Sequence, residues 1–558
     1  MKSFFVFIFI KLAVKKEYDI YCYKNVKTYL KKNKYLFVMK YVKDVVENSV
    51  AFFAGIGVYY TCKNIPNWYR SFGCFFNRKS KKIIRKLPIV EKKIESIREE
   101  LALSAFEEWE KSFDELPDEG LTPTEVLQLA DSLPGNNDWK KGKVSGAVYH
   151  CGDNLTELVQ KMVCNNFWSN PLHSDLFPQI RQMETDIIRM CASLYNASEI
   201  AGCVTSGGTE SIILACKTYR DIGLSRGVEN PELIILDTAH VAFDKAAELL
   251  NMKLVKVKTD SITCKPWWNE LESSITESTV LLVGSAPSFS HGNIDDIGKM
   301  AKLAEKQRIG FHMDACLGGF IIPFSEQELD FRIRGVTSIS LDIHKFGYGP
   351  KGNSVLLYRS RNLIHSQYFV STDWRGGIYI SPTLLGSRNG SIIAGAWATM
   401  IYFGKNGYQT LANNIISTTT EICDELKKLK DIYLIGNPRL CVIALGSDTL
   451  DINEVYDYLT KKGWSLNHLQ YPSGFHLCVT PLFIKNNQQT VFVEDVKKAI
   501  EYIKTTPIDK RERLGPISMV YGTSQNLSER SYIKELGVYY QDLYYSLVKK
   551  NKKKNKNK

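Results

Sequence analysis

Residues 335–352 read GVTSISLDIHKFGYGPKG, and this stretch decides the fold class of the chain. A short apolar run at 338–341 ends in Asp342, and His344 and Lys345 follow before a glycine-rich segment. Short β-branched runs of this kind, set between helical patterns, are typical of a mostly parallel sheet buried on both faces. In such sheets ligands bind where the strands end, so Lys345 stands at a candidate site.

Further apolar runs at 233–236, 280–283, 310–313 and 355–357 alternate with helical patterns from about residue 155. The pattern predicts an α/β fold with a large domain over 151–390 and a smaller α/β domain over 391–547. The smaller domain contains the runs 440–445 and 476–480. A helical segment and linker over 90–150, interrupted by prolines, precedes both domains.

Polar residues follow the ends of several of these runs. The stretches concerned are Asp237-Thr-Ala-His240, Gly284-Ser285-Ala286, Asp314, and Asp342-Ile-His344-Lys345. A fifth stretch, Ser206-Gly207-Gly208-Thr209, directly precedes the helical pattern 210–219. Because a glycine-rich turn that opens a helix presents backbone N–H groups to an anion, this fifth stretch predicts a phosphate site.

One cofactor explains these residues together. Pyridoxal phosphate needs a lysine amine, a carboxylate beside its ring nitrogen, an anion site and a flat group over its ring. Lys345, Asp314, Gly208-Thr209 and His240 supply these in turn, and Ser285 and His344 complete the predicted cofactor-binding set. Taken singly, Asp314 is equally explained as a capping residue and His240 as a core histidine. Their coincidence at the ends of neighbouring runs favours the cofactor.

The net charge of +12 is concentrated at the two ends of the chain. Residues 1–86 carry +15, the basic low-complexity tail at 548–558 holds seven lysines, and the body between them is acidic. This distribution argues against a nucleic-acid partner and favours contact with an anionic membrane surface. The 13 cysteines include no CxxC pair, which indicates reduced thiols and no metal site.

The basic region 1–89 contains a candidate membrane anchor at about 45–62, where residues 48–62 are uncharged and mostly apolar. A spanning helix needs about 20 residues, so a span and a surface-lying helix both remain open. The spacing of Lys554, Lys556 and Lys558 resembles a dilysine retrieval signal, and a simple Asn/Lys tail explains it equally well.

From about residue 144 to 546 the chain resembles the sphingosine-1-phosphate lyase family, within the group II decarboxylases of pyridoxal-phosphate fold type I. The matching stretches include WSNPLH (168–173), VTSGGTES (204–211), HMDACLGGF (312–320), GVTSISLDIHKFGYGPKG (335–352) and TDWRGGIY (372–379). The resemblance implies a large domain with a mostly parallel seven-stranded sheet, and retro-aldol cleavage of phosphorylated sphingoid bases to a long-chain aldehyde and phosphoethanolamine.

The same resemblance implies further roles. Lys345 would bind the cofactor covalently, with Asp314 and His240 as its catalytic companions. The residues implied for the substrate phosphate are Tyr149, Asn170, His173, Lys351 and Tyr379. Gly386 and Ser387 would reach the cofactor phosphate of a neighbouring subunit, since the family forms homodimers with shared sites. The family also implies an endoplasmic-reticulum membrane location, with the catalytic body facing the cytosol.

Two other functions remain open at this point. An amino-acid decarboxylase would share Asp314, His240 and the His344-Lys345 pair. It would need a cation for a carboxylate rather than a phosphate site at Lys351, Tyr149 and His173. A non-catalytic membrane interaction protein on the same fold would have no need to retain Lys345, Asp314 and His240 together.

Overall fold

The computed structural model describes residues 113, 115–133, 135, 138–511, 515 and 531–545. The candidate anchor at 45–62, the rest of the region 1–89 and the lysine-rich tail at 548–558 lie outside the described residues. None of the helices within the described part is long and apolar enough to cross a bilayer.

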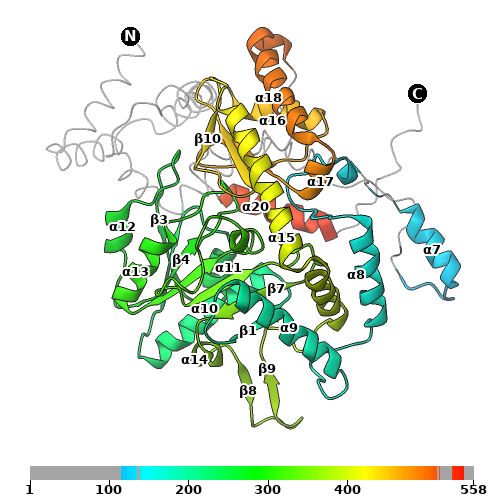
Figure 1. Cartoon of the computed structure of the whole chain (residues 1–558), viewed down its shortest axis with the longest axis vertical. Coiled ribbons are helices and arrows are strands. Elements are labelled where there is room, and N and C mark those ends of the chain that lie inside the picture. The colour runs from blue at the N-terminus through cyan, green and yellow to red at the C-terminus, as the bar shows by residue number, and fades with distance from the viewer. Residues whose placement is uncertain are drawn as a thin grey trace, which may run out of the picture. The chain divides into compact units, whose positions relative to one another are not determined.

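The core of the protein is a seven-stranded sheet in the order β1-β7-β6-β5-β4-β2-β3 (Figure 1). The strands β3, β2, β4, β5 and β6 run parallel to one another, while β7 is antiparallel to both β1 and β6. The strands are β1 (Gly202–Thr205), β2 (Glu232–Leu236), β3 (Lys253–Val257), β4 (Thr279–Ser285), β5 (Gly310–Asp314), β6 (Ser338–Leu341) and β7 (Ser354–Tyr358).

Helices cover both faces of this sheet, because alternate side chains of its central strands point to opposite sides. In β2, Ile234 and Leu236 pack into one buried cluster and Leu233 and Ile235 into another. Helices α9 (Pro178–Leu194), α13 (Ile297–Gln307) and α15 (Gly390–Leu426) contribute to the first cluster, and α10 (Gly208–Ser225) and α11 (Ala242–Leu249) to the second. Burial on both faces explains the unbroken apolar runs of the sequence.

A second, antiparallel sheet has the order β10-β11-β13-β12. Its strands are β10 (Tyr433–Ile435), β11 (Val442–Gly446), β12 (Asn467–Leu469) and β13 (Gly474–Cys478), and they pack with α16 (Ile452–Lys461), α17 (Pro481–Lys485) and α18 (Gln488–Thr505). Helix α15 leads into this sheet and is kinked at Gly404, whose φ of 55° and ψ of −175° interrupt the helical backbone.

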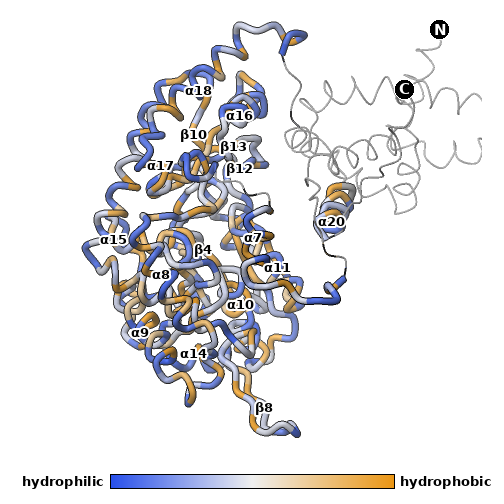
Figure 2. The backbone as a smooth tube through the Cα atoms, turned by 90° about the vertical axis from the view of Figure 1, so that its right-hand side faces the viewer, coloured by the Kyte–Doolittle hydropathy of each residue, from blue (hydrophilic) through white to orange (hydrophobic). Residues whose placement is uncertain are grey.

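A two-stranded hairpin, β8 (Phe369–Ser371) and β9 (Tyr379–Ser381), projects from the body in both views (Figures 1 and 2). The remaining helices are α7 (Pro123–Ser132), α8 (Asp153–Asn165), α12 (Trp268–Ser273), α14 (Arg361–His365) and α20 (Ser531–Tyr545). Short 3-10 helices occupy Asp138–Lys141, Ile322–Phe324 and Ile508–Lys510.

The predicted fold class is confirmed. Each apolar run of the large domain forms a strand or part of one, whereas the runs 440–445 and 476–480 overlap β11 and β13 and extend two residues beyond them. Two strands of the seven-stranded sheet, β1 and β3, were not predicted, and neither were β8, β9, β10 and β12. β1 is only four residues long, and the edge strand β3 has the alternating sequence KLVKV, with exposed lysines at 253 and 256. The domain boundaries at 150/151 and 390/391 stay predictions.

Candidate active site

A cavity of about 320 Å³ lies at the carboxyl ends of β4, β5 and β6, beside the start of α10. It is lined by Ser206, Gly207, Gly208, Thr209, Glu210, Ile212, His240, Pro287, Phe289, Asp314, Cys316, Leu317, Asp342, His344 and Lys345. The parallel strands end at the same edge, so residues more than 130 positions apart in the chain meet here. The stretches that the sequence analysis singled out therefore converge on one site.

Lys345 is held by Asp342 rather than by Asp314. The Lys345 Nζ lies 2.9 Å from Asp342 Oδ2, and Asp342 itself is only 2% exposed. Burial alone would lower the pKa of Lys345, but the Asp342 carboxylate outweighs it and raises this pKa above its ordinary value. The other carboxylate oxygen, Asp342 Oδ1, is buried and has no hydrogen-bond partner among the described residues.

Asp314 ends β5 and turns its carboxylate into the same cavity. Its Oδ1 accepts hydrogen bonds from the Cys316 backbone N–H at 3.0 Å and the Ser340 hydroxyl at 3.4 Å. These contacts fix the orientation of the carboxylate without a cation. Asp314 thus remains available to pair with a positively charged ring nitrogen.

Ser285 does not line the cavity. It pairs with Asp314 in the register of β4 and β5, it is 1% exposed, and its backbone N–H donates to Asp295 Oδ2 at 2.7 Å. Burial raises the pKa of Asp295 to about 7. The loop after β4 instead brings Pro287 and Phe289 to the cavity.

The glycine-rich turn packs tightly against the lysine side of the site. A Cβ on Gly208 would lie 2.8 Å from the Cys316 Sγ and 2.9 Å from both Asp342 carboxylate oxygens. Only glycine allows this approach, which places the first backbone N–H groups of the 18-residue helix α10 beside the cavity. This is the arrangement that a phosphate requires.

His240 lies at the mouth of the cavity, where its ring meets Phe289 edge to face with ring centroids 6.0 Å apart. The His240 Nδ1 accepts a hydrogen bond from the Ala242 N–H at 3.1 Å, which fixes the plane of the imidazole. The ring of Phe289 also packs against His476 on β13, with ring centroids 5.0 Å apart, so the second sheet contacts this side of the site.

Lys351 and Tyr149 form a second group next to Lys345. The Lys351 Nζ stands 4.8 Å from the centre of the Tyr149 ring and donates to the His344 carbonyl at 3.2 Å. Partial desolvation and the nearby Lys345 ammonium lower the pKa of Lys351. Burial, followed by the nearby Cys478 and Cys441 thiols, raises the pKa of Tyr149 well above its usual value, so the phenol stays protonated.

The remaining predicted residues gather elsewhere in the same chain. The Asn170 Nδ2 donates to Ser387 Oγ at 3.1 Å, and its Oδ1 accepts from the Arg388 N–H at 3.2 Å. A Cβ on Gly386 would lie 2.7 Å from the Tyr379 hydroxyl, and the His173 N–H donates to the Asn170 carbonyl. Within the described residues of one chain, none of these five lines the cavity, and neither do Tyr149 and Lys351. The predicted phosphate-binding set therefore forms two groups, one of Tyr149 with Lys351 and one of Asn170, His173 and Tyr379.

The donor set fits pyridoxal phosphate. An amine held by a buried carboxylate, a second carboxylate with no cation, an anion-binding helix start and an oriented imidazole meet in one cavity. The unpartnered Asp342 Oδ1 adds a buried acceptor at the lysine end of the site.

Sequence reasoning missed Asp342, Glu210, Cys316 and Phe289 as site residues. Asp342 carried a signal, since it is the first polar residue after its strand. Phe289 carried none, because the direction of a loop side chain depends on the packing of the loop.

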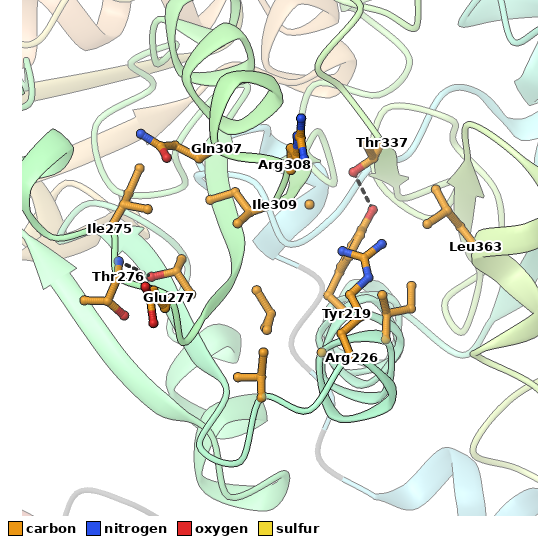
Figure 3. A pocket seen from close by; sticks show the side chains of 16 residues that line it. Tyr219, Arg226, Ile275, Thr276, Glu277, Gln307, Arg308, Ile309, Thr337 and Leu363 are labelled. Carbon is orange, nitrogen blue, oxygen red and sulfur yellow. Dashed lines mark hydrogen bonds between the residues drawn. The ribbon is translucent and has the colours of Figure 1, made fainter.

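A larger cavity of about 680 Å³ lies at the opposite edge of the sheet, where β4 and β5 begin (Figure 3). There the Tyr219 hydroxyl bonds the Thr337 hydroxyl at 2.6 Å, and Arg226 and Arg308 stand at the ends of α10 and α13. None of the predicted site residues lines this cavity. It is therefore not the candidate active site, despite its size.

Comparisons with known proteins agree with this site. The pyridoxal-dependent decarboxylase conserved domain matches residues 133–445, and pyridoxal phosphate is the cofactor. Sphingosine-1-phosphate lyase 1 of Rattus norvegicus is 41% identical over 489 residues, covering 84% of this chain and 85% of the relative. The sphingosine-1-phosphate lyase of Saccharomyces cerevisiae is 40% identical, with 78% and 76% covered.

Solved structures of a sphingosine-1-phosphate lyase and of a decarboxylase are similar to this chain. The sphingosine-1-phosphate lyase of Burkholderia pseudomallei superposes with a TM-score of 0.71 at 31% identity, covering 80% of this chain and 99% of that one. Glutamate decarboxylase of Lactobacillus brevis has a TM-score of 0.62 at 20% identity, covering 72% and 97%, and shares the fold. The chain therefore belongs to the sphingosine-1-phosphate lyase family, on the fold of the pyridoxal-dependent decarboxylases.

Proposed function

We propose that this protein cleaves phosphorylated sphingoid bases between C2 and C3, giving a long-chain aldehyde and phosphoethanolamine. The observation that carries this proposal is the pairing of Lys351 with Tyr149 beside Lys345. An ammonium and a protonated phenol are both donors, as a substrate phosphate requires. Their position next to Lys345 favours a substrate with a phosphate group over an amino acid, whose carboxylate would need a single cation.

When bound, pyridoxal phosphate supplies an electron sink for the pair of electrons released at C2. The chain's own residues would hold it there. The start of α10 would receive its phosphate, Asp314 would pair with its ring nitrogen, and His240 would lie over its ring. Asp342 keeps the Lys345 amine directed into the cavity.

Cleavage also requires a base that takes the proton of the C3 hydroxyl. Lys345, a tyrosine and the substrate phosphate are the available groups. The raised pKa of Tyr149 keeps its phenol protonated, which makes it a hydrogen-bond donor at neutral pH. We assign Tyr149 to the phosphate contact.

We further propose that two copies of the chain share their active sites. Apolar side chains of the hairpin and the segment after it are exposed: Phe369, Val370, Trp374, Ile378, Ile380, Leu384 and Leu385. A projecting apolar surface of this kind is costly in water and is typical of an interface. Asn170, His173, Tyr379, Gly386 and Ser387 lie outside the cavity of their own chain, and a second copy would gain them as contacts for its phosphate groups.

Attachment to the endoplasmic-reticulum membrane, with the catalytic body in the cytosol, is a proposal that rests on the sequence. Its support is the apolar stretch 48–62 and the excess of positive charge at both ends of the chain. Membrane fractionation of cells, followed by protease protection of the body in sealed microsomes, tests both the attachment and the orientation.

The function is tested by incubating the purified protein with pyridoxal phosphate and sphingosine-1-phosphate, and in parallel with glutamate or aromatic amino acids. We expect aldehyde and phosphoethanolamine in a 1:1 ratio from the lipid, and no product from a Lys345→Ala variant. Carbon dioxide from an amino acid without aldehyde from the lipid would make the protein a decarboxylase. Full biological function in a Lys345→Ala strain would indicate a non-catalytic role.

A further inference from the structure

Glu210, in the first turn of α10, is a buried acid that joins two parts of the molecule. Its Oε2 accepts the Ser206 backbone N–H at 2.6 Å, and its Oε1 accepts the Leu384 backbone N–H at 3.0 Å. Ser206 belongs to the turn that would receive the cofactor phosphate. Leu384 belongs to segment 382–388, which follows the exposed hairpin.

The burial of this carboxylate needs an explanation. Glu210 is 6% exposed, and no lysine, arginine or histidine forms an ion pair with it in the part of the chain that the structure describes. Arg388 attracts it electrostatically but is engaged by both carboxylate oxygens of Glu184. A buried acid without an ion pair is expensive, and its two backbone hydrogen bonds are charge-assisted and therefore strong.

Segment 382–388 is part of the apolar surface that we assign to the subunit interface. Leu384 and Leu385 are 55% and 45% exposed, and Ser387 carries the contact to Asn170. A single carboxylate thus fixes both the phosphate turn and a segment of the dimer face. A ligand or partner that orders the Ser206 backbone fixes the Glu210 carboxylate, which strengthens its hydrogen bond to the Leu384 N–H, and the reverse also holds.

We propose that Glu210 is a positioning residue that couples cofactor binding to subunit association. This inference rests on the proposed dimer. Ordering of the phosphate turn by pyridoxal phosphate fixes the Glu210 side chain, which in turn holds segment 382–388 in the shape the second copy meets. By linkage the effect is reciprocal, so association of the subunits tightens cofactor binding by the same factor.

The direct test is hydrogen exchange of the Leu384 amide in the full-length protein, with and without saturating pyridoxal phosphate. In the wild type we expect the cofactor to slow exchange at Leu384 at least tenfold. In Glu210→Gln one of the two acceptors becomes a donor, so we expect the cofactor to change this exchange less than twofold. A charge-assisted hydrogen bond contributes about 1.5–3 kcal/mol, which corresponds to roughly a tenfold effect or more.

The same variants are compared by sedimentation over a dilution series. We expect the cofactor to lower the dimer dissociation constant of the wild type at least tenfold and that of Glu210→Gln less than twofold. Glu229→Gln removes an exposed carboxylate away from both segments and is the matched control. Leu384→Pro deletes the donor from the other side and also removes an apolar side chain of the proposed interface, so only the effect of the cofactor is compared. In Leu384→Pro and in the double variant, the cofactor should lower the dissociation constant less than twofold, as in Glu210→Gln.

Equal slowing of Leu384 exchange in wild type and Glu210→Gln would overturn the inference, as would a tenfold effect of the cofactor on association in the double variant. Product assays on the same samples keep this result separate from the proposed function. The wild type could produce aldehyde while its dimer dissociation constant does not change with pyridoxal phosphate. That result would contradict the coupling and leave the lyase assignment intact.

Discussion

At the scale of single residues, Lys351 has the contacts expected of a phosphate ligand. It is partly desolvated and lies over the Tyr149 ring, and among the described residues its ammonium donates to a backbone carbonyl alone. We expect Lys351→Ala to lower kcat/KM for the phosphorylated lipid about 10- to 100-fold, as loss of one charged hydrogen bond would. Lys351→Arg should recover part of the loss because it keeps the charge. Steady-state kinetics with unchanged kcat/KM in Lys351→Ala would exclude this role.

His312 predicts how stability depends on pH. Its imidazole is fully buried between the Ser338 and Ser340 hydroxyls, and burial lowers its pKa to about 4. Because the unfolded histidine binds its proton near pH 6.5, this group's contribution to stability is present above that pH and is lost as the pH falls toward 4. At pH 5 the contribution of His312 to the free energy of unfolding is smaller by about 2 kcal/mol.

A His312→Asn variant checks this sign. At pH 7.5 its thermal midpoint should be lower than that of the wild type, because the substitution removes the hydrogen bonds of His312 to Ser338 and Ser340. The difference between the two proteins should shrink at pH 5, where only the wild type bears the protonation cost. A difference that stays constant between the two pH values would mean that His312 is not neutral in the folded state.

At the scale of elements, the start of α10 depends on a glycine with no room for a side chain. A methyl group at position 208 would press on Cys316 and on both Asp342 oxygens, so Gly208→Ala should displace either the turn or the carboxylate that holds Lys345. We expect at least tenfold weaker pyridoxal-phosphate binding in an absorbance titration of the apoprotein. Gly298→Ala, on the exposed side of α13 with no atom within 4 Å of the new methyl, is the control and should bind normally.

The hairpin of β8 and β9 is the element on which association should depend. Replacing the exposed Ile378 and Ile380 with glutamate places two charges on the apolar surface, and we expect the dimer to dissociate at micromolar concentration. Sedimentation velocity would detect the change in mass. Ile508→Glu alters an equally exposed apolar residue on another element and should leave the mass unchanged. A dimer that survives both hairpin substitutions would place the interface elsewhere.

At the scale of the whole molecule, we expect the basic amino-terminal region to be dispensable for catalysis by the body. Deleting residues 1–86 removes the apolar stretch and a charge of +15 but no residue assigned to the site. We expect the shortened protein to be recovered in the soluble fraction as an active dimer with the kcat of the full chain. A folded but inactive product would instead make this region part of the active site.

The order of residues along the chain determined the fold class and most of the site. Apolar runs buried on both faces could only be strands of a covered sheet, and Lys345, Asp314, His240 and Gly208 each stood where a run or turn ended. The sequence suffices for this conclusion because the carboxyl ends of parallel strands lie at the same edge of a sheet, however the side chains pack.

Only the tertiary structure decided which of these groups contact one another. It placed Asp342 on Lys345, turned Ser285 away from the cavity, brought Phe289 into it, and joined Ser206 to Leu384 through Glu210. It also divided the predicted phosphate ligands into two groups, Lys351 with Tyr149 and Asn170 with His173 and Tyr379, and none of the five lines the cavity itself. These outcomes depend on the direction of single side chains. That direction is set by close packing, both within short loops and between distant segments such as those of Glu210 and Leu384, and it leaves no periodic trace in the sequence.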